Sequence, residues 1–127
     1  MSNRITSNED TQLVIDFIQL PYVLDVLQLN INKIKKSDLK MKELFVLYLE
    51  GLQNRVLMDV KNVRQQMRQR GIKVYDGVKT EKDLVTEYLC RGYTHKINFL
   101  WSKVRVDVEI RIAAYMDIDL DKLVRLE

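Results

Sequence analysis

The strongest constraint on this chain is a helical repeat that covers most of residues 38–117 and is interrupted once, at Gly71–Thr80. Apolar residues before the interruption recur at spacings of three and four, which places them on one face of a helix. They are Met41, Phe45, Tyr48, Leu52, Val56, Val60, Val63 and Met67. A second apolar series extends from Val85 to Tyr115. The pattern predicts two long helices, 38–70 and 81–117, folded into an antiparallel hairpin.

The two ends of the first long helix differ in composition. The run from Leu44 to Leu49, LFVLYL, is apolar on every side, so we expect it to be buried all round. Beyond Asp59 the segment is polar apart from its stripe, and we expect it to project into solvent. Gly71 then fits the left-handed residue that ends many helices.

The interruption itself has strand character. Ile72, Val74, Val78 and Thr80 alternate around Asp76-Gly77, a dipeptide typical of tight turns between strands. The sequence predicts a short β-hairpin or an ordered loop at this Gly71–Thr80 tip. The residues 80–83 that follow resemble a capping box and would begin the second long helix.

Residues 104–112 allow two interpretations. Apolar and charged residues alternate strictly there, and the apolar ones are β-branched, which is typical of a strand. A helix is favoured because Arg105–Glu109 and Asp107–Arg111 would form opposite-charge pairs one turn apart. A lone long strand would also lack a partner for its backbone. The sequence alone does not decide between helix and strand.

As a helix, residues 104–112 would carry a second apolar face, which is expected to meet a neighbour. The candidate dimer face consists of Val106, Ile110 and Ala113, with Trp101 at its edge.

Residues 7–36 are predicted to form either one helix kinked at Pro21 or two short helices, of which two short helices are favoured. Ser7 and Asp10 have the spacing of a capping box at the first of them. The predicted fold is therefore all-α: a single domain, 1–127, in which the shorter N-terminal helices pack on the long hairpin as a bundle, with a tail at 118–127. The short helices cannot cover the hairpin, and uncovered apolar surface indicates a partner. A second copy of the chain is the simplest one.

Composition limits the class of protein. The chain has 127 residues, of which 46% are hydrophobic and 31% charged, as in one globular domain. A single cysteine allows no internal disulfide, and the polar N-terminus does not resemble a signal peptide. No uninterrupted apolar run approaches the roughly 18 residues of a membrane span. We therefore expect a cytoplasmic protein without membrane association.

The residues that could carry chemistry are few. Cys90 and His95 are five positions apart and would face different sides of a helix, which is poor geometry for a nucleophile and its base. One histidine and one cysteine cannot build a structural zinc site, and no glycine-rich phosphate loop is present. We predict no catalytic residue, no metal and no cofactor, and hence no enzyme.

A basic stretch is the clearest candidate for function. Lys61, Arg64, Arg68, Arg70 and Lys73 form a candidate surface for a protein partner or nucleic acid. Arginines among amide side chains contact phosphates and base edges, although a solvated helix end has the same composition. The sequence predicts a small non-catalytic interaction or regulatory protein, dimeric, with a nucleic-acid-associated protein as the alternative. It does not identify the partner.

Overall fold

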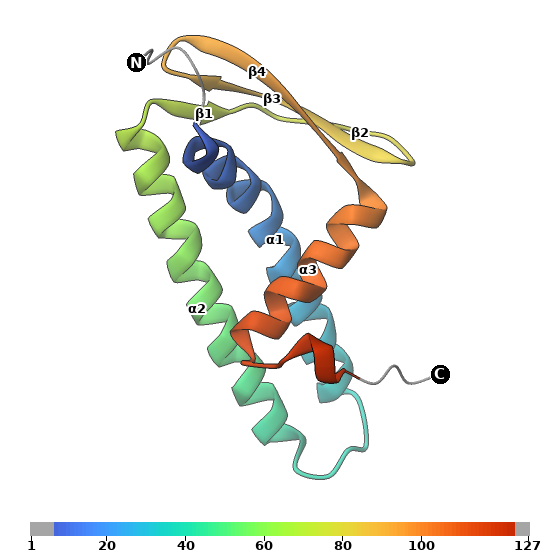
Figure 1. The fold of residues 1–127 in the computed structure, drawn as a ribbon. Helices are drawn as coiled ribbons and strands as arrows, with labels where there is room; N and C mark the ends of the chain where they lie inside the picture. Colours follow the sequence, from blue (N-terminus) through green and yellow to red (C-terminus); the bar gives the residue numbers. More distant parts are fainter. Residues whose placement is uncertain (1–6, 124–127) are drawn as a thin grey trace.

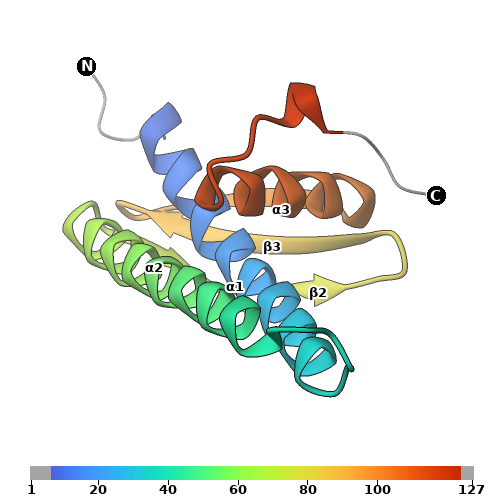
Figure 2. The ribbon, with the colours of Figure 1, turned by 90° about the horizontal axis from the view of Figure 1, so that it is seen from below.

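The computed structural model describes residues 7–123, which form an α+β fold with helices on one face of an antiparallel sheet (Figures 1 and 2). The elements are α1 (Asn8–Lys35), α2 (Lys42–Gln69), β1 (Ile72–Val74), β2 (Val78–Lys79), β3 (Asp83–Cys90), β4 (Tyr93–Leu100), α3 (Trp101–Tyr115) and the 3-10 turn η1 (Leu120–Lys122). Helix α1 packs against both α2 and α3. The all-α prediction is wrong.

The predicted second long helix, 81–117, is instead two strands followed by a shorter helix. Val85, Leu89 and Ile97 are spaced by multiples of four, and residues four apart share a face in a strand as well as in a helix. Arg91 (φ 48°) and Gly92 (φ 88°) make the two-residue turn between β3 and β4. Both have the positive φ that such turns require. Thr80 Oγ1 does accept from the Asp83 N–H at 3.1 Å, but it caps the entry to a strand.

Strand β3 is the centre of the sheet. Strands β1 and β2 both pair with it along one side (Ile72 opposite Cys90, Val78 opposite Val85), and β4 pairs with it along the other. The predicted hairpin around Asp76-Gly77 is therefore wrong, because β1 and β2 are successive parts of one edge rather than partners. Glycine suits position 77, because a Cβ there would lie 2.6 Å from Leu84 Cδ1 and 3.1 Å from the Val85 carbonyl oxygen, and these neighbours would have to shift.

Helix α1 is continuous, so the favoured prediction of two N-terminal helices is wrong and the alternative of a single helix through Pro21 holds. Pro21 lies inside it with an exposed ring, and the helix loses one backbone hydrogen bond there. The predicted capping box is confirmed. Ser7 Oγ accepts from the Asp10 N–H, and Asp10 Oδ2 accepts from the Ser7 N–H, both at 3.1 Å.

The core lies between the helices and the inner face of the sheet. It includes Leu13, Val14, Leu20, Val23, Leu27, Leu52, Val56, Val63, Met67, Ile72, Leu84, Tyr88, Cys90, Phe99, Val104 and Val108. The C-terminal half of α2 and the N-terminal half of α1 lie near the sheet, whereas the α1–α2 connection projects away from it (Figure 1).

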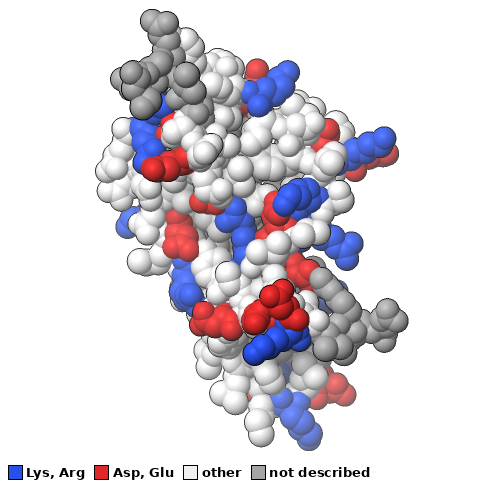
Figure 3. Space-filling view, viewed as in Figure 1, with Lys and Arg blue, Asp and Glu red and all other residues white. Residues whose placement is uncertain are grey.

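The predicted burial along α2 is reversed. Leu44, Phe45, Leu47 and Tyr48 are 49–65% exposed, and Val46 is the buried member of the LFVLYL run. Val63 and Met67, in the half expected to project, are buried because the sheet follows directly after them. Figure 3 shows uncharged surface at the lower end of the molecule, with charged side chains beside it. Helix α2 also begins at Lys42 rather than after Ser37.

Residues 104–112 are helical, so the interpretation favoured for them is confirmed. The ion-pair partners of Asp107 and Arg111 differ from those expected. Asp107 accepts from Lys103, and Arg111 pairs with Asp16 of α1 at 2.8 Å.

Candidate interaction surfaces

The first candidate surface is a basic groove, which we define by Lys61, Arg64 and Arg68 of α2 and Lys73 of β1. Its volume is about 630 Å³, and its apolar lining consists of Phe17, Leu57, Val60, Met67, Ile72 and Val74. The three α2 cations share a helix face at spacings of three and four. Lys73 joins them because the chain turns back at Gly71, whose φ is +67°.

Two of the four cations lie over aromatic rings. The Arg64 guanidinium carbon lies 5.7 Å from the Phe17 ring centre, and Lys73 Nζ lies 5.6 Å from that of Tyr75. Such contacts are favourable but leave the positive charge uncompensated. No Asp or Glu of residues 7–123 lines the basic groove, and none of its four cations forms an ion pair with a described residue.

Arg70, predicted to belong to this surface, faces elsewhere. Two residues beyond Arg68, it is rotated by about 200° around the helix. Arg70 pairs with Glu9 at 2.5 Å and with the buried Asp10 at 3.1 Å, and Arg91 pairs with Asp10 at 2.7 Å. Hydrogen bonds from Arg91, and from Arg70 and Ser7, hold the pKa of Asp10 well below its usual range despite burial. This cluster joins α1, α2 and the β3–β4 turn and has a structural role.

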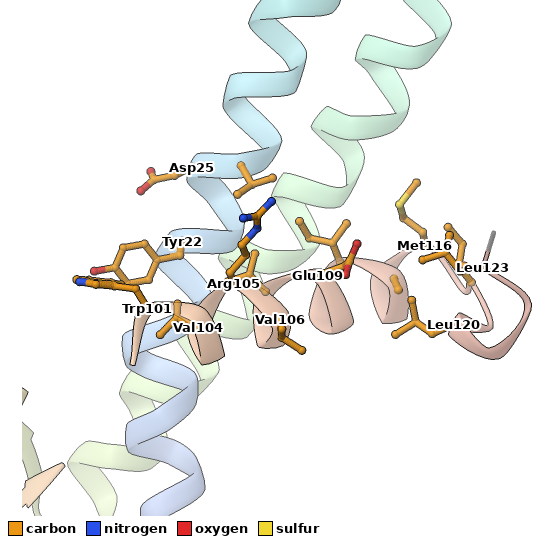
Figure 4. A pocket seen from close by; sticks show the side chains of 15 residues that line it. Tyr22, Asp25, Trp101, Val104, Arg105, Val106, Glu109, Met116, Leu120 and Leu123 are labelled. Carbon is orange, nitrogen blue, oxygen red and sulfur yellow. The ribbon is translucent and has the colours of Figure 1, made fainter. Parts of the chain in front are cut away.

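The second candidate surface is an apolar groove of about 830 Å³ between α1, α3 and the segment after α3 (Figure 4). Its lining includes Tyr22 and Val26 of α1, Trp101, Val106, Ile112 and Ala113 of α3, and Ile118, Leu120 and Leu123 beyond. The sequence argument missed the residues that α1 and the tail contribute. The apolar positions 118, 120 and 123 were the available signal.

The residues of the predicted dimer face do not share one exposed surface in the structure. Val106 and Ile110 are 51% and 47% exposed, and they lie one turn apart on the outer side of α3. Ala113 is buried, and its carbonyl accepts from the Ile118 N–H at 2.9 Å. Trp101 is half-buried, donates its indole N–H to the Thr80 carbonyl at 2.8 Å and meets the Tyr22 ring edge-on.

A polar network fastens α3 to α1. The buried Gln19 donates to Asp107 at 2.9 Å and accepts from Arg111 at 2.9 Å. Burial raises the pKa of Asp107, but hydrogen bonds from Lys103 and Gln19 outweigh it and leave the pKa below its usual value. No buried side-chain nitrogen or oxygen of the described residues lacks a partner.

The residues considered for chemistry do not come together. Cys90 is buried, and its Sγ donates to Asp10 Oδ2 at 3.8 Å. His95 stacks on Tyr88, with ring centres 5.2 Å apart. Within residues 7–123, no group of three His, Cys, Asp or Glu side chains is placed to hold a metal ion.

Comparison with known proteins identifies a family. A family model described as YhjD protein matches residues 4–120 of the chain. No curated protein and no solved structure matches it.

Proposed function

This chain belongs to the YhjD protein family, whose description names no reaction or partner, and we propose that it is a small, non-catalytic interaction protein that forms homodimers through α3. The observation that carries the proposal is the pair Val106 and Ile110, half-exposed on the outer side of α3 beside the apolar groove. Apolar side chains clustered beside a wide groove mark interaction sites.

A second copy is the occupant we propose for this face. An isologous contact places the same helix of each protomer against the other, so the apolar face of α3 is buried twice. A stable interface buries about 800 Å² on each partner. The exposed Ile118 and Leu123 beside the apolar groove extend the patch beyond α3 itself. The cytoplasmic location stays a prediction.

Light scattering on a size-exclusion peak tests the dimer. The wild type should elute at about twice the 15.1 kDa chain mass. Val106→Glu with Ile110→Lys should give a folded monomer without changing the net charge. Leu57→Glu with Met58→Lys is the matched control, because Leu57 and Met58 are 53% and 64% exposed on α2. A monomeric wild type at high micromolar concentration, or equal dissociation of the control, would refute the proposal.

The alternative, binding of nucleic acid, is supported by the basic groove, which four cations and no Asp or Glu of residues 7–123 line. If the groove neutralises three or four phosphates of a duplex, the log–log slope of affinity against salt should be about −2.7 to −3.6, since each contact releases about 0.9 counterion. Arg64→Glu with Arg68→Glu should abolish binding. Arg70 must be left intact, because its replacement would disrupt the Asp10 cluster. Salt-independent binding, or no binding at low salt, would exclude this function.

A further inference from the structure

A second apolar surface lies at the end of the molecule opposite the sheet. We define the tip as residues 29–48, which comprise the end of α1, the connection and the first turns of α2. Seven of its large apolar side chains are 49–71% exposed: Leu29, Leu39, Met41, Leu44, Phe45, Leu47 and Tyr48. No residue of the tip lines the basic groove or the apolar groove, and the proposed dimer leaves the tip uncovered.

The apolar side chains of the tip point in several directions. Successive residues of a helix are rotated by about 100°, so Leu44, Phe45 and Leu47 lie on three different sides of α2. Val46 occupies the remaining side and packs toward α1, where it is buried. A flat or grooved protein partner covers one side of a helix. A lipid phase surrounds an inserted segment and covers all three exposed sides at once.

The tip is predominantly positively charged. It contains five lysines, at 33, 35, 36, 40 and 42, and two carboxylates, Asp38 and Glu43. Its net charge of +3 equals that of the whole chain, so the remaining 16 basic and 16 acidic residues balance. Lys42 Nζ also donates to the Lys35 and Ser37 carbonyls, at 3.0 and 3.1 Å, and closes the connection.

We propose that the tip docks on an anionic lipid surface, with the first two turns of α2 inserted among the headgroups and the lysines against the phosphates. Two turns of helix rise about 10 Å, which matches the 5–10 Å depth reached by interfacial helices. Lysine stems extend along apolar surface and leave the charge at the headgroups, and tyrosine favours the same boundary. A second copy of the chain fits the tip less well, because an isologous contact would oppose two sets of five lysines.

The docking proposed for the tip needs no spanning segment. By length and composition alone, α1 is apolar enough to cross a membrane, but core helices pass the same test, and the buried stripe of α1 belongs to the core of this fold. The expectation of no membrane contact depended on the absence of a spanning run, which does not concern surface docking.

Vesicle co-sedimentation tests the proposal with the full chain. Vesicles of phosphatidylcholine with 30% phosphatidylglycerol should bind the protein, and pure phosphatidylcholine vesicles should bind it far less. Lys33, Lys36 and Lys40 changed to Gln should weaken binding to the anionic vesicles by about 100-fold, since each lysine near the surface contributes about fivefold, the equivalent of about 1 kcal/mol. Raised salt should weaken wild-type binding in the same direction.

A matched pair of substitutions separates insertion from charge. Leu47 and Val78 are 65% and 66% exposed, and Val78 lies on the sheet, far from the tip (Figure 1). Leu47→Glu should lower the partition coefficient more than tenfold, because it removes an inserted leucine as well as adding a charge. Val78→Glu adds the same charge and should change binding less than threefold. Far-UV circular dichroism must show both variants folded.

Three outcomes would overturn membrane docking: no binding to anionic vesicles, equal losses in Leu47→Glu and Val78→Glu, or a tip that is already covered in solution. The last would appear as a dimer that Leu47→Glu converts to monomer. Failure of the α3 dimer is distinguishable, since Val106→Glu with Ile110→Lys should still bind vesicles.

Discussion

Replacing Asp10 by Asn tests the proposed structural role of the cluster around it. The Asp10 carboxylate is 1% exposed and accepts from Arg91 at 2.7 Å and from Arg70 at 3.1 Å. Asn has nearly the same size, and its side-chain oxygen can still accept a hydrogen bond from the Ser7 N–H. The substitution therefore removes mainly the charge on which two arginines converge.

The expected loss of stability follows from the exposure of the partners. Removing one member of a fully buried ion pair costs about 3–5 kcal/mol. Here Arg70 and Arg91 are 35% and 30% exposed, so water can rehydrate them after the change. We expect a loss of about 2–3 kcal/mol in the free energy of unfolding. At roughly 4 °C per kcal/mol for a chain of this length, Tm should fall by about 8–12 °C.

Urea unfolding followed by circular dichroism measures this loss. Glu9→Gln is the matched control, because Glu9 contacts the same Arg70 but is 76% exposed, and exposed pairs contribute about 0–1 kcal/mol. Equal losses for the two variants would refute the argument that burial of Asp10 makes its charge important.

The pH dependence adds an independent check on Asp10. Because folding lowers its pKa, ionised Asp10 stabilises the fold above the unfolded value of 3.8, and this contribution disappears as pH falls below it. The stability difference between wild type and Asp10→Asn should therefore be constant from pH 7 to about 5 and shrink at lower pH. A difference that grows on acidification would contradict the assigned direction.

Three further substitutions probe the backbone and α3. Gly92→Ala should lower the free energy of unfolding by about 1–2 kcal/mol, because φ is +88° at this position. Gly51→Ala should raise it by about 0.5–1 kcal/mol, because Gly51 lies inside α2 and a Cβ there meets nothing within 4 Å. Thermal unfolding measures both changes, and changes of the same sign would contradict this reasoning. Tyr115→Phe should lose about 1 kcal/mol with the hydrogen bond to Asp59, measured by urea unfolding. Burial and that bond raise the pKa of Tyr115, so its stabilisation is present below pH 10 and is lost as pH rises. Absorbance titration should show one late-ionising tyrosine in the wild type that Tyr115→Phe lacks.

Local signals in the sequence were sufficient for some elements of the fold. The capping box at Ser7 depends on neighbours within one turn, and it is present in the structure. The predicted stripe of α2 is correct only from Leu52 onward, because Met41, Phe45 and Tyr48 are exposed. The strands were missed because a spacing of four does not distinguish period two from period 3.6. Arg91-Gly92 was the decisive turn, and it was interpreted as the interior of a helix.

The candidate interaction surfaces were predictable only in part, because they depend on how the helices and strands pack against one another. The α2 spacing places Lys61, Arg64 and Arg68 together, but Lys73 joins them through the reversal at Gly71. The apolar run at 44–49 was taken as buried because composition does not tell which end of a helix the sheet will cover. Residues 83–100 form β3 and β4 of the sheet that covers the C-terminal end of α2, but the sequence argument assigned these residues to a helix.

The hydrogen bond between Gln19 and Arg111 has a consequence for synthesis of the chain. These residues are 92 positions apart in the sequence, whereas residues paired between neighbouring strands are at most 18 positions apart. At 5–20 residues per second, a ribosome needs roughly 5–20 s after adding Gln19 before it adds Arg111. During that interval α2 is available to cover α1, but α3 is not. The nascent chain therefore presents one uncovered side of α1 until its last helix emerges.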